Sequence, residues 1–147
     1  MSFSGELQGI LASYQEDLKQ LDQSLRPGDG ILGFGRVPGN DLCHERFDER
    51  IAALTKRVTQ ANSDRQEAAE LVRMLLRCDA EFSLPVYAQT MLVAVQRHAL
   101  PLISRLTRNE ARELRLWYEK QYPRFKRMPV QKEVLRALKQ IEQNNES

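Results

Sequence analysis

The densest group of reactive side chains in the sequence lies in one short polar segment. Asp41, His44 and Asp48 are three and four residues apart, which places them along one side of a helix, and their groups are common metal ligands. A di-iron bundle would need paired Glu-x-x-His motifs, whereas His98 has Val95 three residues before it. The alternative is a helix start capped by Asp41 with a packed histidine. We therefore predict no metal and no other cofactor.

A cysteine lies within the same segment. Cys43 precedes His44, which suggests a nucleophile and its base, but adjacent helical residues diverge by ~100° and do not face each other. We predict no catalytic residues. Cys43 and Cys78 are too few for a disulfide scaffold and lack zinc-type spacing, so we expect free, largely shielded thiols in a cytoplasmic protein.

The second histidine, His98, falls among apolar residues of a predicted helix. A buried neutral imidazole needs a partner for each ring nitrogen. We therefore expect a core histidine that is hydrogen-bonded to a tyrosine, a backbone carbonyl or a carboxylate.

A glycine-rich but apolar loop spans residues 27–40 and holds five of the seven glycines. Backbone amides of such a loop can bind anions, and Arg36 could assist. However, the spacing fits neither nucleotide-binding fingerprint, and no Lys-Ser or Lys-Thr pair follows. We predict a structural loop folded over the bundle. The alternative is a ligand- or partner-binding loop that uses Phe34 and Arg36.

Basic side chains collect in the last third of the chain. Residues 105–139 hold eleven Lys or Arg against four Asp or Glu, whereas residues 1–104 hold eleven against fourteen. The first four arginines are spaced by three, four and three residues, which predicts one helical stripe, and aromatic residues follow. The predicted binding residues, here called the basic stripe, are Arg105, Arg108, Arg112, Arg115, Lys120, Arg124, Lys126 and Arg127.

Three interpretations of the basic stripe remain open. Arginines beside aromatic side chains suit phosphate contact and base stacking in a nucleic acid. The same charge suits an acidic protein partner. It also suits a merely solvated face, because Glu119 lies four residues after Arg115 on the same stripe, and no helix-turn-helix spacing accompanies it.

The elements that position these residues are helices. Leucine outnumbers valine and isoleucine together, and no strand-like alternation of useful length occurs. We predict an all-α bundle of about five to six helices in one domain, residues 1–147. The expected helices are roughly 5–25, 41–61, 64–81, 84–100, 107–121 and 129–143.

Local signals refine these boundaries. Ser63 is the predicted cap of the third helix, and Ser83 with Pro85 opens the fourth. Thr107 and Glu110 form a predicted capping box. The first helix carries an apolar seam long enough to support self-association, formed by Leu7, Leu11, Tyr14, Leu18, Leu21 and Leu25.

The sequence favours a small non-catalytic helical protein that binds another protein or a second copy of itself. The alternative is a nucleic-acid-binding protein that uses the basic–aromatic region 105–139. A metal- or thiol-dependent enzyme is the third hypothesis. The first residues carry no signal-peptide pattern, and the most apolar window is interrupted by polar residues, so we expect no membrane association.

Overall fold

The structure, a computed structural model, describes residues 2–23, 40–61, 64–82, 84 and 86–144. Over these ranges the chain is an all-α bundle without a strand, as the sequence predicts. The glycine-rich loop with Phe34 and Arg36, and the predicted caps Ser63, Ser83 and Pro85, lie outside the described residues. The elements are α1 (Phe3–Gln23), α2 (Asn40–Gln60), α3 (Arg65–Glu81), α4 (Val86–Ala94), the 3₁₀ helix η2 (Val95–Arg105), α5 (Arg108–Gln121), the short 3₁₀ helix η3 (Arg124–Lys126) and α6 (Pro129–Asn144).

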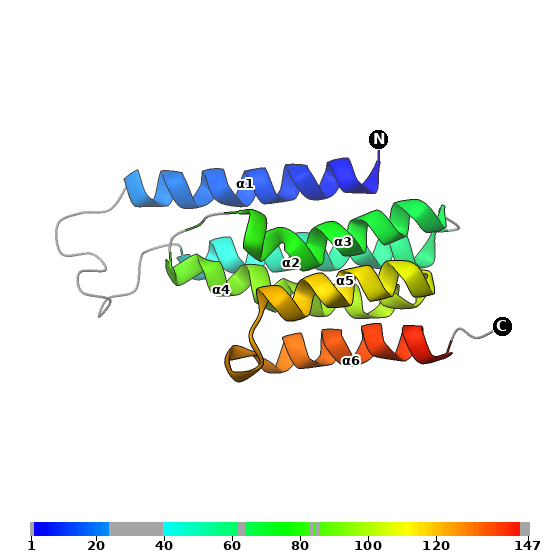
Figure 1. Ribbon diagram of the computed structural model, residues 1–147. Helices are drawn as coiled ribbons and strands as arrows, with labels where there is room; N and C mark the ends of the chain where they lie inside the picture. The colour runs from blue at the N-terminus through cyan, green and yellow to red at the C-terminus, as the bar shows by residue number, and fades with distance from the viewer. Residues whose placement is uncertain (1, 24–39, 62–63, 83, 85, 145–147) are drawn as a thin grey trace.

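The helices stack side by side, with α1 along one side of the bundle and α6 along the other (Figure 1). Between them, α2 and α3 pack against α1, and α5 packs against α6. The centre is occupied by η2, which contacts α2, α3, α4 and α6. The turn that joins α5 to α6 lies at the end of the bundle opposite to the start of α1 (Figure 1). This topology places the basic residues after α5 at one end of the molecule.

The predicted apolar faces form one hydrophobic core. In α1, Leu7, Leu11, Tyr14 and Leu18 are at most 3% exposed, and α1 packs against α2 and α3. The described part of the α1 seam is therefore covered by the chain itself and offers no apolar face to a second copy. The predicted interpretation of this seam as a self-association surface is wrong for these four residues.

The predicted fourth helix differs from the structure in its winding and its end. The sequence predicts one helix over residues 84–100, but α4 ends at Ala94 and η2 continues through Pro101 to Arg105. The proline explains the change, because it has no N–H and in an α-helix its ring would clash with the carbonyl of Arg97. Eleven residues of 3₁₀ helix are unusually many, since such runs rarely exceed about four.

The winding of η2 sorts its side chains into straight lines, because a 3₁₀ helix has about three residues per turn. Gln96, Ala99 and Leu102 form a line with no exposed surface that is directed into the core. His98 and Pro101 lie on a different line, on which His98 is half-buried and Pro101 is exposed. This arrangement lets η2 serve as the central element while leaving one edge open beside α2.

Helix starts follow local sequence, with one correction. Thr107 and Glu110 form the predicted capping box, in which each side chain binds the other residue's backbone N–H at 3.1 and 2.8 Å. The cap of α3 is Asp64, whose carboxylate accepts from the Gln66 N–H at 3.1 Å, and not the predicted Ser63. Asp and Ser are equally good N-cap residues, so the sequence alone did not distinguish two neighbouring candidates.

Candidate functional site

Arg105 does not belong to the helix that carries the other arginines. It is the last residue of η2, and the chain then leaves helical geometry at Leu106, where φ is −75° and ψ is 146°. The guanidinium of Arg105 donates to the carbonyl oxygens of Val58 at 3.1 Å and Thr59 at 2.9 Å. It thereby satisfies carbonyls in the last turn of α2. The predicted stripe of four arginines on one helix is therefore wrong at its first member.

Arg115 joins α5 to α6. Its side chain is 21% exposed and forms a two-pronged ion pair with Glu142 of α6, with a further bond to Glu119 at 3.3 Å. The hydrogen bond with Glu142 raises the pKa of the Arg115 guanidinium and lowers the pKa of the Glu142 carboxyl. Glu119 also lies 3.8 Å from Lys139. A guanidinium held in this way stabilises the α5–α6 pair and is not free for a phosphate.

The rest of α5 presents a separate exposed line at every fourth residue. Arg108, Arg112 and Lys120 are exposed, and Leu116 between them is 51% exposed. Leu116 is missing from the sequence prediction. It could have been found there, because it lies off the apolar face that Leu114 and Tyr118 define.

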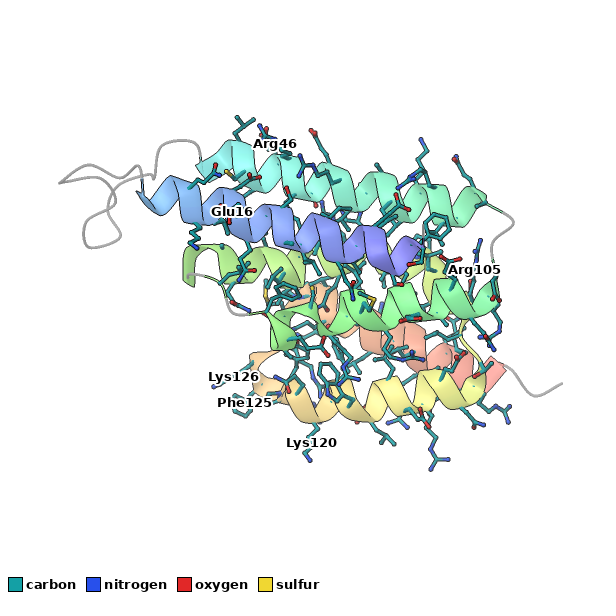
Figure 2. All side chains as sticks on the ribbon, turned by 90° about the horizontal axis from the view of Figure 1, so that it is seen from above. Glu16, Arg46, Arg105, Lys120, Phe125 and Lys126 are labelled. Atoms are coloured by element: carbon teal, nitrogen blue, oxygen red, sulfur yellow. The ribbon has the colours of Figure 1, made fainter. Side chains whose placement is uncertain are left out.

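Four further side chains gather with Lys120 at the α5–α6 turn. The aromatic ring of Phe125 is 84% exposed, and Met128 is 39% exposed. Lys126 lies with its ammonium 5.7 Å from the centre of the Phe125 ring. Figure 2 shows Lys120, Phe125 and Lys126 projecting at one end of the molecule, whereas Arg105 lies at the other end. We call this surface the tip; it consists of Lys120, Arg124, Phe125, Lys126 and Met128.

The tip is built on a firmly held turn. The Tyr122 hydroxyl donates to Asp79 of α3 at 3.0 Å, and burial raises the pKa of this hydroxyl, as does Asp79. The Lys126 N–H donates to the Pro123 carbonyl at 2.9 Å, and the Arg127 guanidinium donates to the Tyr122 carbonyl at 2.9 Å. Arg127, a predicted binding residue, is thus half-buried and supports the turn.

The predicted metal-ligand group is divided among different partners. His44 places Nδ1 2.5 Å from the Tyr14 hydroxyl on α1. Asp48 instead accepts from Arg97 at 2.7 Å and is 2.9 Å from His98 Nε2. The side chain of Asp41 lies outside the described residues. Within the part of the chain that the structure describes, no three His, Cys, Asp or Glu side chains gather as metal ligands would.

His98 is hydrogen-bonded to the Asp48 carboxylate, one of the three kinds of partner expected from the sequence, but the ring lies nearer the surface than expected. Its side chain is 17% exposed, at the edge of η2 that faces α2. The prediction of a core position rested on an α-helical phase, which the 3₁₀ winding changes.

Both cysteines are free thiols, as predicted. Cys78 is buried, its thiol donates to the Leu75 carbonyl at 3.1 Å, and burial raises its pKa to about 12. Cys43 is half-buried, and burial followed by the charge of Asp17 raises its pKa. Because the thiolate is the reactive form, both environments lower the reactivity of the sulfur.

Comparison of the chain with known families, curated proteins and solved structures finds no match. No helix among the described residues is both long and apolar enough to cross a bilayer.

Proposed function

We propose that the protein acts by binding and not by catalysis, and that its tip docks an acidic segment of another protein. The observation that carries the proposal is the Phe125 ring, which is 84% exposed on an ordered turn. Aromatic anchors supply much of the energy of protein interfaces, because they bury a large apolar area with few rotatable bonds. An exposed ring at this place is the natural anchor of an interface.

The fixed turn supports the proposal energetically. Ordering a loop on binding costs free energy, and a preorganised loop avoids that cost. Here Tyr122 ties the turn to α3, and the Met128 N–H donates to Gln131 at 2.8 Å where α6 begins. Phe125 is therefore presented by a platform that already has its geometry.

The charge around Phe125 supports an acidic partner. From Lys120 to Lys132 the sequence carries five cationic side chains and no carboxylate side chain. Of these, Lys120, Arg124 and Lys126 are exposed around the ring. Opposite charges steer encounter and fix orientation. The partner that fits is a protein segment with several carboxylates around an apolar residue or pocket.

The alternative partner is a nucleic acid, which the geometry favours less. Single-strand binders use several exposed rings along a basic groove. At the tip Phe125 is exposed, whereas Tyr118 is buried and Trp117 and Tyr122 are partly buried against the core. Two arginines of the predicted stripe, Arg105 and Arg115, are engaged within the fold.

The proposed location is the cytoplasm. Two free thiols, one of them in the core, support a reducing compartment, because disulfides are the usual outcome of paired cysteines in an oxidising one.

The test is a selection of short random peptides displayed on phage against the full chain. The expected peptides combine several Asp or Glu residues with one large apolar residue. Their dissociation constants should rise about tenfold or more in Phe125→Ala. The double variant Arg124→Ser/Lys126→Ser should weaken binding and flatten its salt dependence.

Matched controls come from exposed residues elsewhere. Leu42→Ala removes another exposed apolar side chain, on α2, and Arg108→Ser/Arg112→Ser removes two cations of α5, so both should leave affinity unchanged. Selected peptides without an acidic bias, or with equal affinity for Phe125→Ala, would contradict the proposal. Binding of generic DNA or RNA at low salt tighter than ~10⁻⁶ M would assign the tip to nucleic acid instead.

A further inference from the structure

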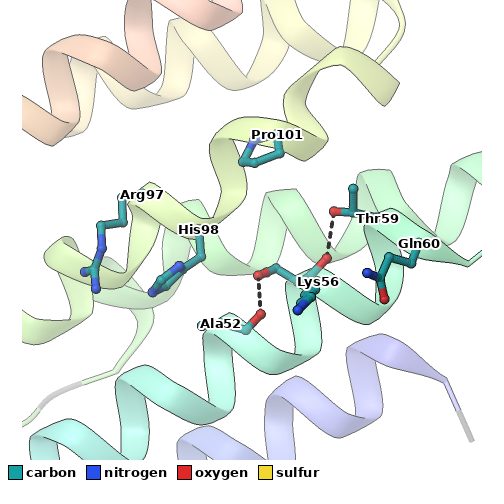
Figure 3. A pocket seen from close by; sticks show the side chains of 8 residues that line it. Ala52, Lys56, Thr59, Gln60, Arg97, His98 and Pro101 are labelled. Atoms are coloured by element: carbon teal, nitrogen blue, oxygen red, sulfur yellow. Dashed lines mark hydrogen bonds between the residues drawn. The ribbon is translucent and has the colours of Figure 1, made fainter.

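We propose that a second site, a cleft between α2 and η2, binds a small organic carboxylate. The cavity has a volume of about 330 Å³, which lies at the small end of the range of ligand pockets. Figure 3 shows Lys56, Thr59 and Gln60 on α2 facing Arg97, His98 and Pro101 on η2. The cleft is formed by other residues than the tip, so the two proposals stand independently.

The cleft exists because the side chains in the middle of both walls are small or short. On α2, Ala52, Thr55 and Thr59 follow at helical spacing along the face that lines the cleft. The Thr55 hydroxyl donates to the Ile51 carbonyl at 3.1 Å, and the Thr59 hydroxyl donates to the Thr55 carbonyl at 2.8 Å. These hydroxyls are satisfied within α2 and do not reach across. On the other side, the exposed Pro101 ring leaves space that a longer side chain would fill.

The cleft carries unbalanced positive charge. Among the described residues, Asp48 is the carboxylate that pairs with residues of the lining, and it is engaged by Arg97 at 2.7 Å. Lys56, an exposed lining residue, has no hydrogen bond or ion pair to any described residue. The partial negative charge at the end of α2 is met by Arg105. An anion in the cleft would therefore meet the Lys56 ammonium as its counter-ion.

Two further polar side chains, His98 and Gln60, line the cleft with Lys56. Asp48 lies 2.9 Å from His98 Nε2 and fixes the orientation of the ring; in the tautomer that donates from Nε2, Nδ1 is an acceptor, so the ring shapes the cleft and does not bond to an anion. Gln60 makes no hydrogen bond to the described part of the chain. A carboxylate has two acceptor oxygens, which suits the Lys56 ammonium and the Gln60 amide N–H as donors.

The apolar part of the lining decides between ligand classes. Ala52 and Pro101 supply carbon surface on opposite walls, which an inorganic anion would leave unfilled. A multiply charged phosphate would also favour more than one unpaired cation. The class that fits is a monocarboxylate with a compact apolar body.

The probes are benzoate and hexanoate, titrated into the full ¹⁵N-labelled chain and followed by backbone amide shifts. We expect saturable shifts at Lys56, Thr59 and His98 with a dissociation constant of ~5 mM or tighter, as suits ligands of this size. Benzamide, the neutral counterpart of benzoate, should bind about fivefold more weakly, and inorganic phosphate should not saturate.

Two variants separate the charge of the site from its shape. Lys56→Gln should weaken benzoate binding about fivefold, whereas Lys19→Gln, at the opposite end of the antiparallel α1–α2 pair, should change nothing. Ala52→Leu fills the cleft without changing charge and should abolish the shifts. The proposal fails if neither carboxylate saturates, if benzamide binds as well as benzoate, or if phosphate binds more tightly. It also fails if Lys56→Gln binds benzoate as tightly as the wild type, or if the shifts persist in Ala52→Leu.

Discussion

The hydroxyl of Tyr118 donates to the side-chain carbonyl of Gln96 at 2.5 Å, and neither residue has exposed surface. The bond joins α5 to η2 inside the apolar core. The Gln96 amide nitrogen also donates to the Leu76 carbonyl of α3 at 3.4 Å. A single glutamine therefore links three elements, and burial of its amide is tolerated because its polar atoms have partners.

Substitutions of Tyr118 and Gln96 should be energetically coupled. Tyr118→Phe leaves the Gln96 oxygen buried without a donor and should lower the free energy of unfolding by about 1–3 kcal/mol. Gln96→Leu removes the same bond from the other side. In urea denaturation the double variant should be clearly less destabilised than the two single variants added together. Simple additivity would show that the two side chains do not form this bond.

Because of the Arg115–Glu142 ion pair, the free energy of unfolding should depend on pH in the acidic range. Pairing lowers the pKa of Glu142 below its ordinary value of 4.5, so the unfolded chain takes up this proton at higher pH than the folded chain. The stabilisation is complete above pH 4.5 and is lost as pH falls through the lowered pKa of the folded state.

The check is Glu142→Gln, which should cost about 1 kcal/mol at neutral pH and progressively less in acid. Glu133→Gln removes an exposed carboxylate from the same helix and is the matched control. A stability difference between wild type and Glu142→Gln that stays constant down to pH 2 would contradict the assigned pair.

Truncation of Arg105 should destabilise the fold, whereas truncation of Arg108 should not. Arg105→Ala removes a charged donor from the Val58 and Thr59 carbonyls and should destabilise the fold by about 1–2 kcal/mol. Hydrogen exchange should accelerate in the last turn of α2. Arg108→Ala removes an exposed cation and should stay within about 0.5 kcal/mol of wild type. Equal effects of the two variants would argue against the cap on α2.

The two thiols should be modified in a fixed order. Cys78, with a pKa of about 12 and a buried sulfur, should react with a thiol reagent only when the protein unfolds. Cys43 is half-buried and should react in the native state, more slowly than a free thiol. Cys43→Ser identifies the faster phase. A native Cys78 that reacts as fast as Cys43 would show that α3 is not packed as described.

Features that depend on local contacts could be predicted from the sequence. The capping box of Thr107 and Glu110 spans three residues, and the apolar spacing of α1 and α2 follows from helix geometry alone. Features that depend on a distant residue or on a change from α-helical to 3₁₀ winding could not be predicted. Glu142 lies 27 residues from Arg115, so the sequence could not show that this arginine is already paired.

The two candidate sites, the tip and the cleft, also combine features that the sequence shows with features that it does not show. The charge of the tip was visible in the sequence, but the exposure of Phe125 was not, because the turn at 122–128 has no helical period that would place the ring. The cleft beside Lys56 was invisible for another reason. It depends on Pro101 and on 3₁₀ winding, and one α-helix across the region would have placed His98 differently.

Because the side chains of η2 form three straight lines, the burial of each residue depends on the exact number of residues before it in the segment. One residue inserted before Ala99 would turn everything after it by about 120°, and Pro101 would take the buried place that Leu102 holds. Three inserted residues would restore the phase but would push α5 along the bundle by about 6 Å. Naturally occurring variants of this chain should therefore exchange side chains within η2 while keeping its length, and they should gain or lose residues elsewhere.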